Sequence, residues 1–272
     1  MKILNTSFKL LLPALLLTVT ANAQKLPKIQ TASVLAPANT KVDGKTTEFG
    51  NKFQAFNRTT EVYYTLSNSA TKLYLTIQSN ERRIVKKVIA NGITLTIMAD
   101  PKQSKDGLAV TFPTYGKSER PPFYNLRNPY LEVKDTTVNN AMADSVMNTY
   151  NTDLTSRLKM IGVIGDPNVP DSTLSVFNTE GFKAAGRFDH KLAFTFELAI
   201  PLSLIKFAAD KPGYFKYTLQ VNGPPGDVQT DGNNQLYYIA GDGSRVNIGW
   251  PGPDNLGFSN PTSFSGEYTL AK

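Results

Sequence analysis

Short segments that alternate apolar and polar residues constrain this fold more than any other feature of the sequence. Residues 92–98 (GITLTIM) alternate strictly, with the large aliphatic side chains on one side and the threonines on the other. Residues 191–200 (KLAFTFELAI) and 214–221 (YFKYTLQV) repeat the pattern with phenylalanine and leucine. A two-residue period is typical of a β-strand that buries one face. These segments therefore predict strands that pack against a core.

Turn signals separate the apolar segments at the spacing of antiparallel hairpins. Residues 61–66 (EVYYTL) and 72–78 (KLYLTIQ) flank a short polar turn, and Asp106-Gly107 leads into a further apolar run at 108–112. A last strand is expected at 266–270. Helices do not alternate regularly with these strands, as they would in βαβ units. We therefore predict an all-β, mainly antiparallel protein, a β-sandwich of the jelly-roll-like kind.

The middle of the chain interrupts the strand pattern. Residues 117–130 (KSERPPFYNLRNPY) are rich in proline, which favours a long loop. Residues 139–160 carry apolar residues at steps of three and four, which predicts one or two short helices. We expect a loop and helix insertion at about 113–165. Because no linker separates two cores, we predict a single sandwich domain over 41–272.

The first 23 residues have the three parts of a secretory signal peptide. Two lysines supply positive charge, residues 10–20 are apolar, and Ala21-Asn22-Ala23 is a small-x-small cleavage motif. The apolar stretch is too short for a membrane span, which needs about 20 residues. We therefore expect an exported protein that is periplasmic, attached to the cell surface or secreted, with no transmembrane span and with an extended leader at 24–40.

Cysteine content and charge exclude several classes of function. The chain has no cysteine, which excludes disulfides, thiolate metal sites, cysteine nucleophiles and a lipoprotein anchor. The formal net charge is +7, with one local cluster of basic residues at 82–87 that lies in an apolar run. We expect this cluster to be a solvated stripe on an edge strand or a short helix, and not a nucleic-acid contact.

Several short motifs occur in an order known from one group of exported domains. Val42-Asp43-Gly44 forms a DG turn, and Leu73-Tyr74 opens a strand after a tight turn. Ile93–Ile97 precedes Asp100-Pro101, and residues 197–201 read E-L-A-I-P. In this order the motifs resemble family 9 carbohydrate-binding modules and the related DOMON-type domains. The resemblance implies a β-sandwich that binds its ligand through loops at one end.

The resemblance directs attention to aromatic and polar residues near the turns. Family members that bind sugars clamp the sugar ring between tryptophans, and this chain has a single one, Trp250, with Asp254 and Asn255 nearby. Phe49 stands where the family has an aromatic residue after the DG turn. Glu197 could bind a sugar hydroxyl or a cation, or pair with a lysine or arginine of a neighbouring strand. Trp250 could equally close one end of the core.

One acidic turn is a candidate calcium site. Asp227, Asp231 and Asn233 could supply oxygen ligands to the ion. Their spacing does not match an EF-hand loop, and turns favour aspartate, asparagine and glycine in any case. We therefore leave calcium as a possibility and predict no other cofactor.

The chain offers few groups for haem or catalytic chemistry. His190 is the only histidine. The resemblance to DOMON-type domains would pair it with Met98 or Met160 as axial haem ligands. Residues 189–191 read instead as an exposed hairpin turn. With one histidine and no cysteine, no catalytic set can be assembled, so we expect a protein without enzymatic activity.

Two functions from different classes remain open. The first is an exported, non-catalytic binding module whose partner is a glycan. The alternative is a structural or assembly protein of the cell envelope. In that case the exposed sheet and the insertion would bind another protein.

Overall fold

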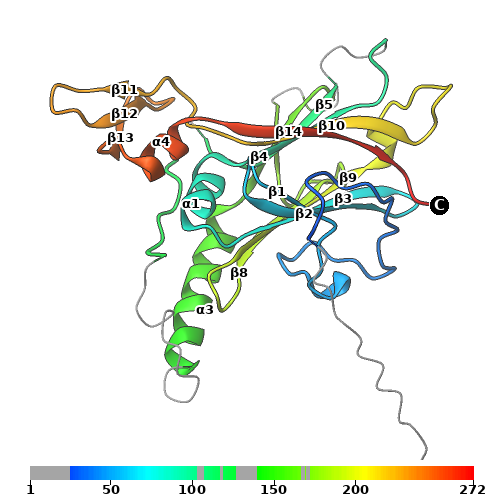
Figure 1. Cartoon of the computed structure of the whole chain (residues 1–272), viewed down its shortest axis with the longest axis horizontal. Coiled ribbons are helices and arrows are strands. Elements are labelled where there is room, and N and C mark those ends of the chain that lie inside the picture. The colour runs from blue at the N-terminus through cyan, green and yellow to red at the C-terminus, as the bar shows by residue number, and fades with distance from the viewer. Residues whose placement is uncertain (1–24, 103–106, 117–118, 127–139, 167–168, 170–171) are drawn as a thin grey trace, which may run out of the picture.

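Two antiparallel β-sheets stack face to face and form a β-sandwich (Figure 1). The computed structural model describes residues 25–102, 107–116, 119–126, 140–166, 169 and 172–272. The predicted signal peptide lies outside these residues. In the described part of the chain, none of the helices is both long and apolar enough to cross a membrane.

The first sheet contains five strands within the described residues. In spatial order they are β1 (Ala55–Asn57), β2 (Val62–Asn68), β3 (Lys72–Ser79), β9 (Phe194–Pro201) and β8 (Lys183–Phe188). The second sheet contains six. They are β14 (Thr262–Thr269), β10 (Tyr214–Val221), β4 (Ile93–Met98), β5 (Leu108–Thr114), β6 (Met160–Ile164) and β7 (Thr173–Ser175).

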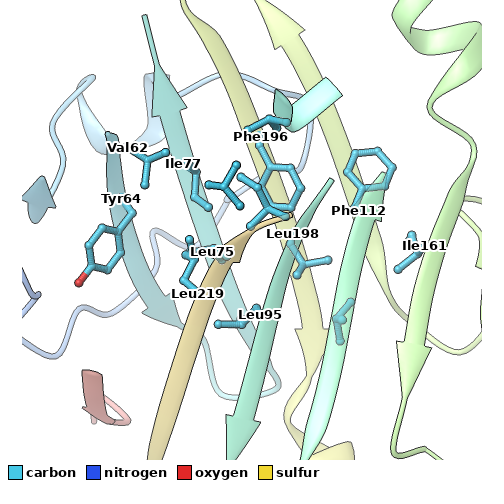
Figure 2. Close-up of a cluster of buried hydrophobic side chains, with 14 of the residues drawn as sticks. Val62, Tyr64, Leu75, Ile77, Leu95, Phe112, Ile161, Phe196, Leu198 and Leu219 are labelled. Carbon is cyan, nitrogen blue, oxygen red and sulfur yellow. The ribbon is translucent and has the colours of Figure 1, made fainter. Parts of the chain in front are cut away.

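The core lies between the two sheets, where apolar side chains of both inner faces meet (Figure 2). The ring centroids of Phe112, from the second sheet, and Phe196, from the first, are 5.6 Å apart. The hydroxyl groups of Tyr64 and Tyr217 hydrogen-bond at 2.9 Å across the same gap. Alternate residues of each strand therefore point inwards, and burial of their apolar surface stabilises the sandwich.

The alternating segments form the strands that the sequence predicts. Residues 92–98 contain β4, and residues 214–221 are β10 with the same bounds. The predicted hairpin of 61–66 and 72–78 is the antiparallel pair of β2 and β3. The last strand is longer than predicted, because β14 begins at Thr262 and pairs with β10 along its whole length. The expected antiparallel all-β class is confirmed.

The described residues of the insertion contain one long helix, where one or two short ones are predicted. Helix α3 (Asn140–Arg157) has 18 residues and packs against β8, the edge strand of the first sheet. Met147, Leu154 and Leu158 are buried at or just beyond the helix, at the spacing of one helical face. Because β5 and β6 are neighbours in the second sheet, the helix belongs to the connection between two paired strands.

A second excursion, which the sequence does not predict, joins β10 to β14. Residues 222–261 form a small three-stranded sheet and helix α4 (Pro253–Ser259), which project beyond one end of the sandwich (Figure 1). The strands of the small sheet are β11 (Gln229–Thr230), β12 (Leu236–Ile239) and β13 (Arg245–Gly249). Two single turns of 3-10 helix complete the described elements, η1 (Thr47–Phe49) and η2 (Leu202–Leu204).

The basic cluster at 82–87 lies on helix α1 (Arg82–Asn91), so the expectation of a short helix there is confirmed. Its apolar residues are buried, and the helix contacts strands of both sheets and α4. The expected solvated stripe is wrong for one member. Lys87 is only 1 % exposed, and its Nζ donates a hydrogen bond to the carbonyl oxygen of Asn260. The helix seats this lysine against the residue that follows α4.

A candidate ligand-binding cleft

A cleft of about 290 Å³ opens between the end of the sandwich and the small sheet. Helix α1 forms one wall, residues 120–126 form a second, and β12, β13 and α4 form the third. Its lining is mainly apolar and aromatic, as in most small-ligand sites. Its polar and aromatic lining residues include Lys86, Arg120, Phe123, Tyr238 and Asn255.

The small sheet builds its wall by strand alternation. Tyr238 of β12 lies directly opposite Val246 of β13 in the register, so both side chains leave the same face of the sheet, and both line the cleft. The side chains of the neighbouring residues, Tyr237 and Arg245, point to the opposite face of the small sheet. There the Arg245 guanidinium stacks on the Tyr237 ring at 4.0 Å from its centroid. One face of this short sheet is therefore apolar towards the cleft, and the other is polar towards solvent.

Residues 120–126 form the opposite wall of the cleft, to which Arg120 and Phe123 contribute their side chains. The Arg120 side chain donates to the Asp242 carboxylate at 2.8 Å and also to the Ser244 hydroxyl, which ties the segment to the small sheet. The Phe123 ring is 82 % exposed, and the Lys86 ammonium lies 5.5 Å from its centroid. A large aromatic ring thus faces solvent at the mouth of the cleft.

A second, polar hollow continues the cleft on the other side of Arg120. Its volume is about 1040 Å³, and it shares Arg120, Pro121 and Tyr238 with the apolar cleft. Asn222 and Gln220 of the second sheet line it, with the Gln220 amide donating to Asn222 at 3.0 Å. An extended ligand could therefore leave an aromatic surface and meet amide groups.

Trp250, Asp254 and Asn255 lie together beside this cleft. Asn255 lines it, and its side-chain amide donates to the carbonyl oxygen of Trp250 at 2.8 Å. The Trp250 side chain is 59 % exposed, so it does not close the core. Asp254 is exposed in the first turn of α4. The structure thus gathers three of the five sequence candidates at one end of the molecule.

Phe49 and Glu197 lie elsewhere and do not line the cleft. Phe49 ends η1 and is half-buried. Glu197 is only 3 % exposed. Its Oε2 accepts hydrogen bonds from the main-chain N–H groups of Asp43 at 2.9 Å and Gly44 at 2.8 Å. The expected lysine or arginine partner is thus replaced by the DG turn, which this carboxylate holds on the sheet.

Burial dominates the ionisation of Glu197. Desolvation of the carboxylate raises its pKa to about 7, although the two N–H donors oppose the shift. Thr76 Oγ1 is 3.4 Å from the other carboxylate oxygen. With its oxygens turned towards these groups, Glu197 acts as an internal anchor for the chain around the DG turn.

The acidic turn is held by internal hydrogen bonds. Asp231 Oδ1 accepts from the main-chain N–H groups of Asn233 and Gln235, both at 2.9 Å, and its other oxygen pairs with Arg245. These contacts lower the pKa of Asp231. Asp227 lines the polar hollow. Among the described residues, no three histidine, aspartate or glutamate side chains gather closely enough to hold a metal ion.

His190 lies in the turn between β8 and β9, where the sequence places an exposed hairpin. Its Nδ1 is 3.1 Å from Asp144 Oδ1, and its side chain is 74 % exposed. Met98 and Met160 belong to strands of the other sheet. The geometry around His190 is therefore that of a solvated turn residue paired with a carboxylate.

Phe123, Tyr238 and Arg120 are missing from the candidates that the sequence suggests. The proline pair before Phe123 marks a loop, and an aromatic residue in a loop is a signal of a binding site, as it is for Trp250.

Neither a scan against models of protein families nor a search of curated proteins finds a match to this chain. The function is therefore inferred from the geometry of the cleft.

Proposed function

We propose that this protein is an exported, non-catalytic β-sandwich that binds a carbohydrate in the cleft beside the small sheet. The observation that carries the proposal is the exposed Phe123 ring at the mouth of a cleft with aromatic walls. An aromatic face stacks on the C–H face of a sugar ring. The Arg120 guanidinium and the Asn255 amide line the same cleft and can bond sugar hydroxyls.

The volume and the mixed character of the lining fit a small part of a glycan. A volume of about 290 Å³ is near the lower end of the range for small-molecule sites. One or two sugar units would occupy the apolar part, and the next units would extend into the polar hollow. The Gln220 amide then supplies a donor and an acceptor to the chain of hydroxyls, held in place by its hydrogen bond to Asn222.

A second candidate function is the docking of an envelope protein on the outer surface near α4. Trp250 is 59 % exposed, and Leu256 of α4 is 48 % exposed. Grouped apolar side chains on a surface are typical of protein contacts. This function would use the outside of the small sheet and α4, and it would leave the cleft empty.

The test is binding of the purified protein to a panel of soluble glycans, with affinities measured by calorimetry. Phe123→Ala is expected to weaken binding at least tenfold, because it removes the stacking surface. Phe177→Ala is the matched control. Phe177 is 75 % exposed and lies 5.0 Å from a lysine ammonium, that of Lys159, but it does not line the cleft.

Equal loss of affinity in both variants would contradict the cleft as the binding site. A blank glycan panel, together with an envelope protein that is retained by wild type and lost in Trp250→Ala, would favour the second candidate function. Circular dichroism of each variant checks that the sandwich remains folded.

A further inference from the structure

A second hollow, separate from the cleft, lies on the outer face of the first sheet. It has a volume of about 490 Å³ and lies between the DG turn, helix α3 and the hairpin of β8 and β9. Its floor is a polar row across three strands. Gln78 of β3 and Arg187 of β8 are both register partners of Thr195 in β9, and the Gln78 amide donates to the Thr195 hydroxyl at 2.9 Å.

Two internal anchors fix the walls of this hollow. On one side, the buried Glu197 carboxylate holds the main chain of Asp43 and Gly44. On the other side, the Asn151 side chain of α3 hydrogen-bonds the main chain of the edge strand β8, as a neighbouring strand would. Its amide donates to the Phe188 carbonyl oxygen at 3.1 Å and its carbonyl accepts from the Phe188 N–H at 2.8 Å. The walls are therefore set before any ligand binds, which lowers the entropic cost of binding.

Among the lysine, arginine and aspartate side chains that line the hollow, the positive ones outnumber the negative one. Arg187 is half-buried and forms none of the ion pairs found among the described residues. Lys45 and Lys191 line the rim. The Lys45 ammonium is 4.0 Å from the Asp43 carboxylate. The Asp189 carboxylate, which also lines the hollow, accepts the main-chain N–H of Lys191 at 2.8 Å.

We infer that this hollow binds an oxyanion group, a carboxylate or a sulfate, with Arg187 as its principal contact. The planar guanidinium presents a fork of donors that matches either group, and partial burial strengthens the charge-assisted hydrogen bonds. Asn148, which also lines the hollow, can donate to the same oxygens. This site does not depend on carbohydrate binding in the cleft. It gives the protein a means of holding an anionic ligand on a different face.

The test is an NMR titration of the ¹⁵N-labelled protein with sodium sulfate and, separately, with sodium acetate. Ionic strength is held constant with sodium chloride. The expected result is a saturable shift of the Arg187 side-chain N–H and of the β8–β9 hairpin amides. The anion that saturates at the lower concentration identifies the preferred group. Glucose, which is neutral, is expected to leave these resonances unchanged.

Variants distinguish a specific anion site from nonspecific attraction of anions to positive charge. Arg187→Gln is expected to weaken binding at least tenfold, and Arg187→Lys to weaken it severalfold because the fork is lost. Lys183→Gln is the matched control, since it removes the same charge from the same face of β8 and does not line the hollow. Phe123→Ala is expected to bind the anion normally.

The absence of a saturable shift with either anion would overturn the inference. So would equal binding by wild type and Arg187→Gln. If Arg187→Gln fails to give a dispersed amide spectrum, the double variant Lys45→Gln with Lys191→Gln replaces it. That variant is expected to weaken anion binding at least threefold, and unchanged binding would count against the site.

Discussion

Glu197 Oε2 accepts a hydrogen bond from the main-chain N–H of Gly44 at 2.8 Å, across 153 residues of sequence. The same oxygen accepts the N–H of Asp43. One carboxylate oxygen in the middle of a sheet thus fixes the turn that begins the described sandwich. We therefore expect both the stability of the protein and the shape of the hollow around Arg187 to depend on this contact.

Two replacements of Glu197 are expected to show how much of its contribution to stability comes from hydrogen bonding and how much from its charge. In Glu197→Gln the amide oxygen can accept both N–H bonds, so the expected loss at neutral pH is less than about 1 kcal/mol. Glu197→Ala leaves two buried N–H groups without an acceptor and should cost about 2–4 kcal/mol. Urea denaturation measures both free energies of unfolding. An alanine variant as stable as the glutamine variant would argue against the anchor.

The ionisation of Glu197 is expected to make the stability of the folded protein depend on pH. Its pKa is raised from 4.5 to about 7 in the folded state, so between these values the folded protein binds more protons than the unfolded chain. The stability contribution is therefore full below pH 4.5 and is lost as pH rises through 7, by at most about 3 kcal/mol. The difference in unfolding free energy between wild type and Glu197→Gln should follow this trend. A difference that is constant with pH would contradict the shifted pKa.

Lys87 is expected to produce the opposite trend at alkaline pH. Burial, and to a lesser degree Arg83, lower its pKa from 10.5 to about 8. Between these values the unfolded chain binds more protons, so stability should rise with pH. Lys87→Met removes this dependence. The exposed neighbour Lys86 is the control, and Lys86→Met should keep the slope of the wild type in denaturation curves measured from pH 8 to 10.

Substitution of Gly44 is expected to disturb the contact between the DG turn and β8. Its φ is +77°, and a Cβ would lie 2.5 Å from Arg187 Cβ. Gly44→Ala should therefore cost about 2–4 kcal/mol, from backbone strain and a steric clash. Gly232→Ala, in a turn where a Cβ would have no atom within 4 Å, should change stability by less than about 0.5 kcal/mol. Thermal unfolding of the two variants checks the contrast, and equal melting temperatures would contradict it.

The sequence predicts the sandwich well because apolar and polar residues alternate along its central strands. The segment at 214–221, for example, has the same bounds as β10. The small sheet is missed because β11 has only two residues and β12 only four. Both are embedded in aspartate, glycine and asparagine that read as turns. Such short strands carry too few residues to show a period.

The candidate site is predicted only in part, for a different reason. Trp250 and Asn255 are close in sequence, so their association could be expected. Phe123 and Tyr238 come from excursions that leave two different strand pairs, and only the folded sandwich brings them together in one cleft. The partners of Glu197 are main-chain N–H groups, which no pattern of side chains reveals.

The most direct test of carbohydrate binding in the cleft is the fluorescence of Trp250, the only tryptophan of the chain. Its main-chain carbonyl oxygen accepts a hydrogen bond from Asn255, which lines the cleft, so a ligand that contacts Asn255 is expected to alter the surroundings of Trp250. Titration with a glycan that binds in the panel should change the emission saturably in wild type and in Phe177→Ala. In Phe123→Ala the midpoint of the change should move to at least tenfold higher glycan concentration. Glycan binding that leaves the emission of wild type unaltered, or that persists at full affinity in Phe123→Ala, would contradict the account.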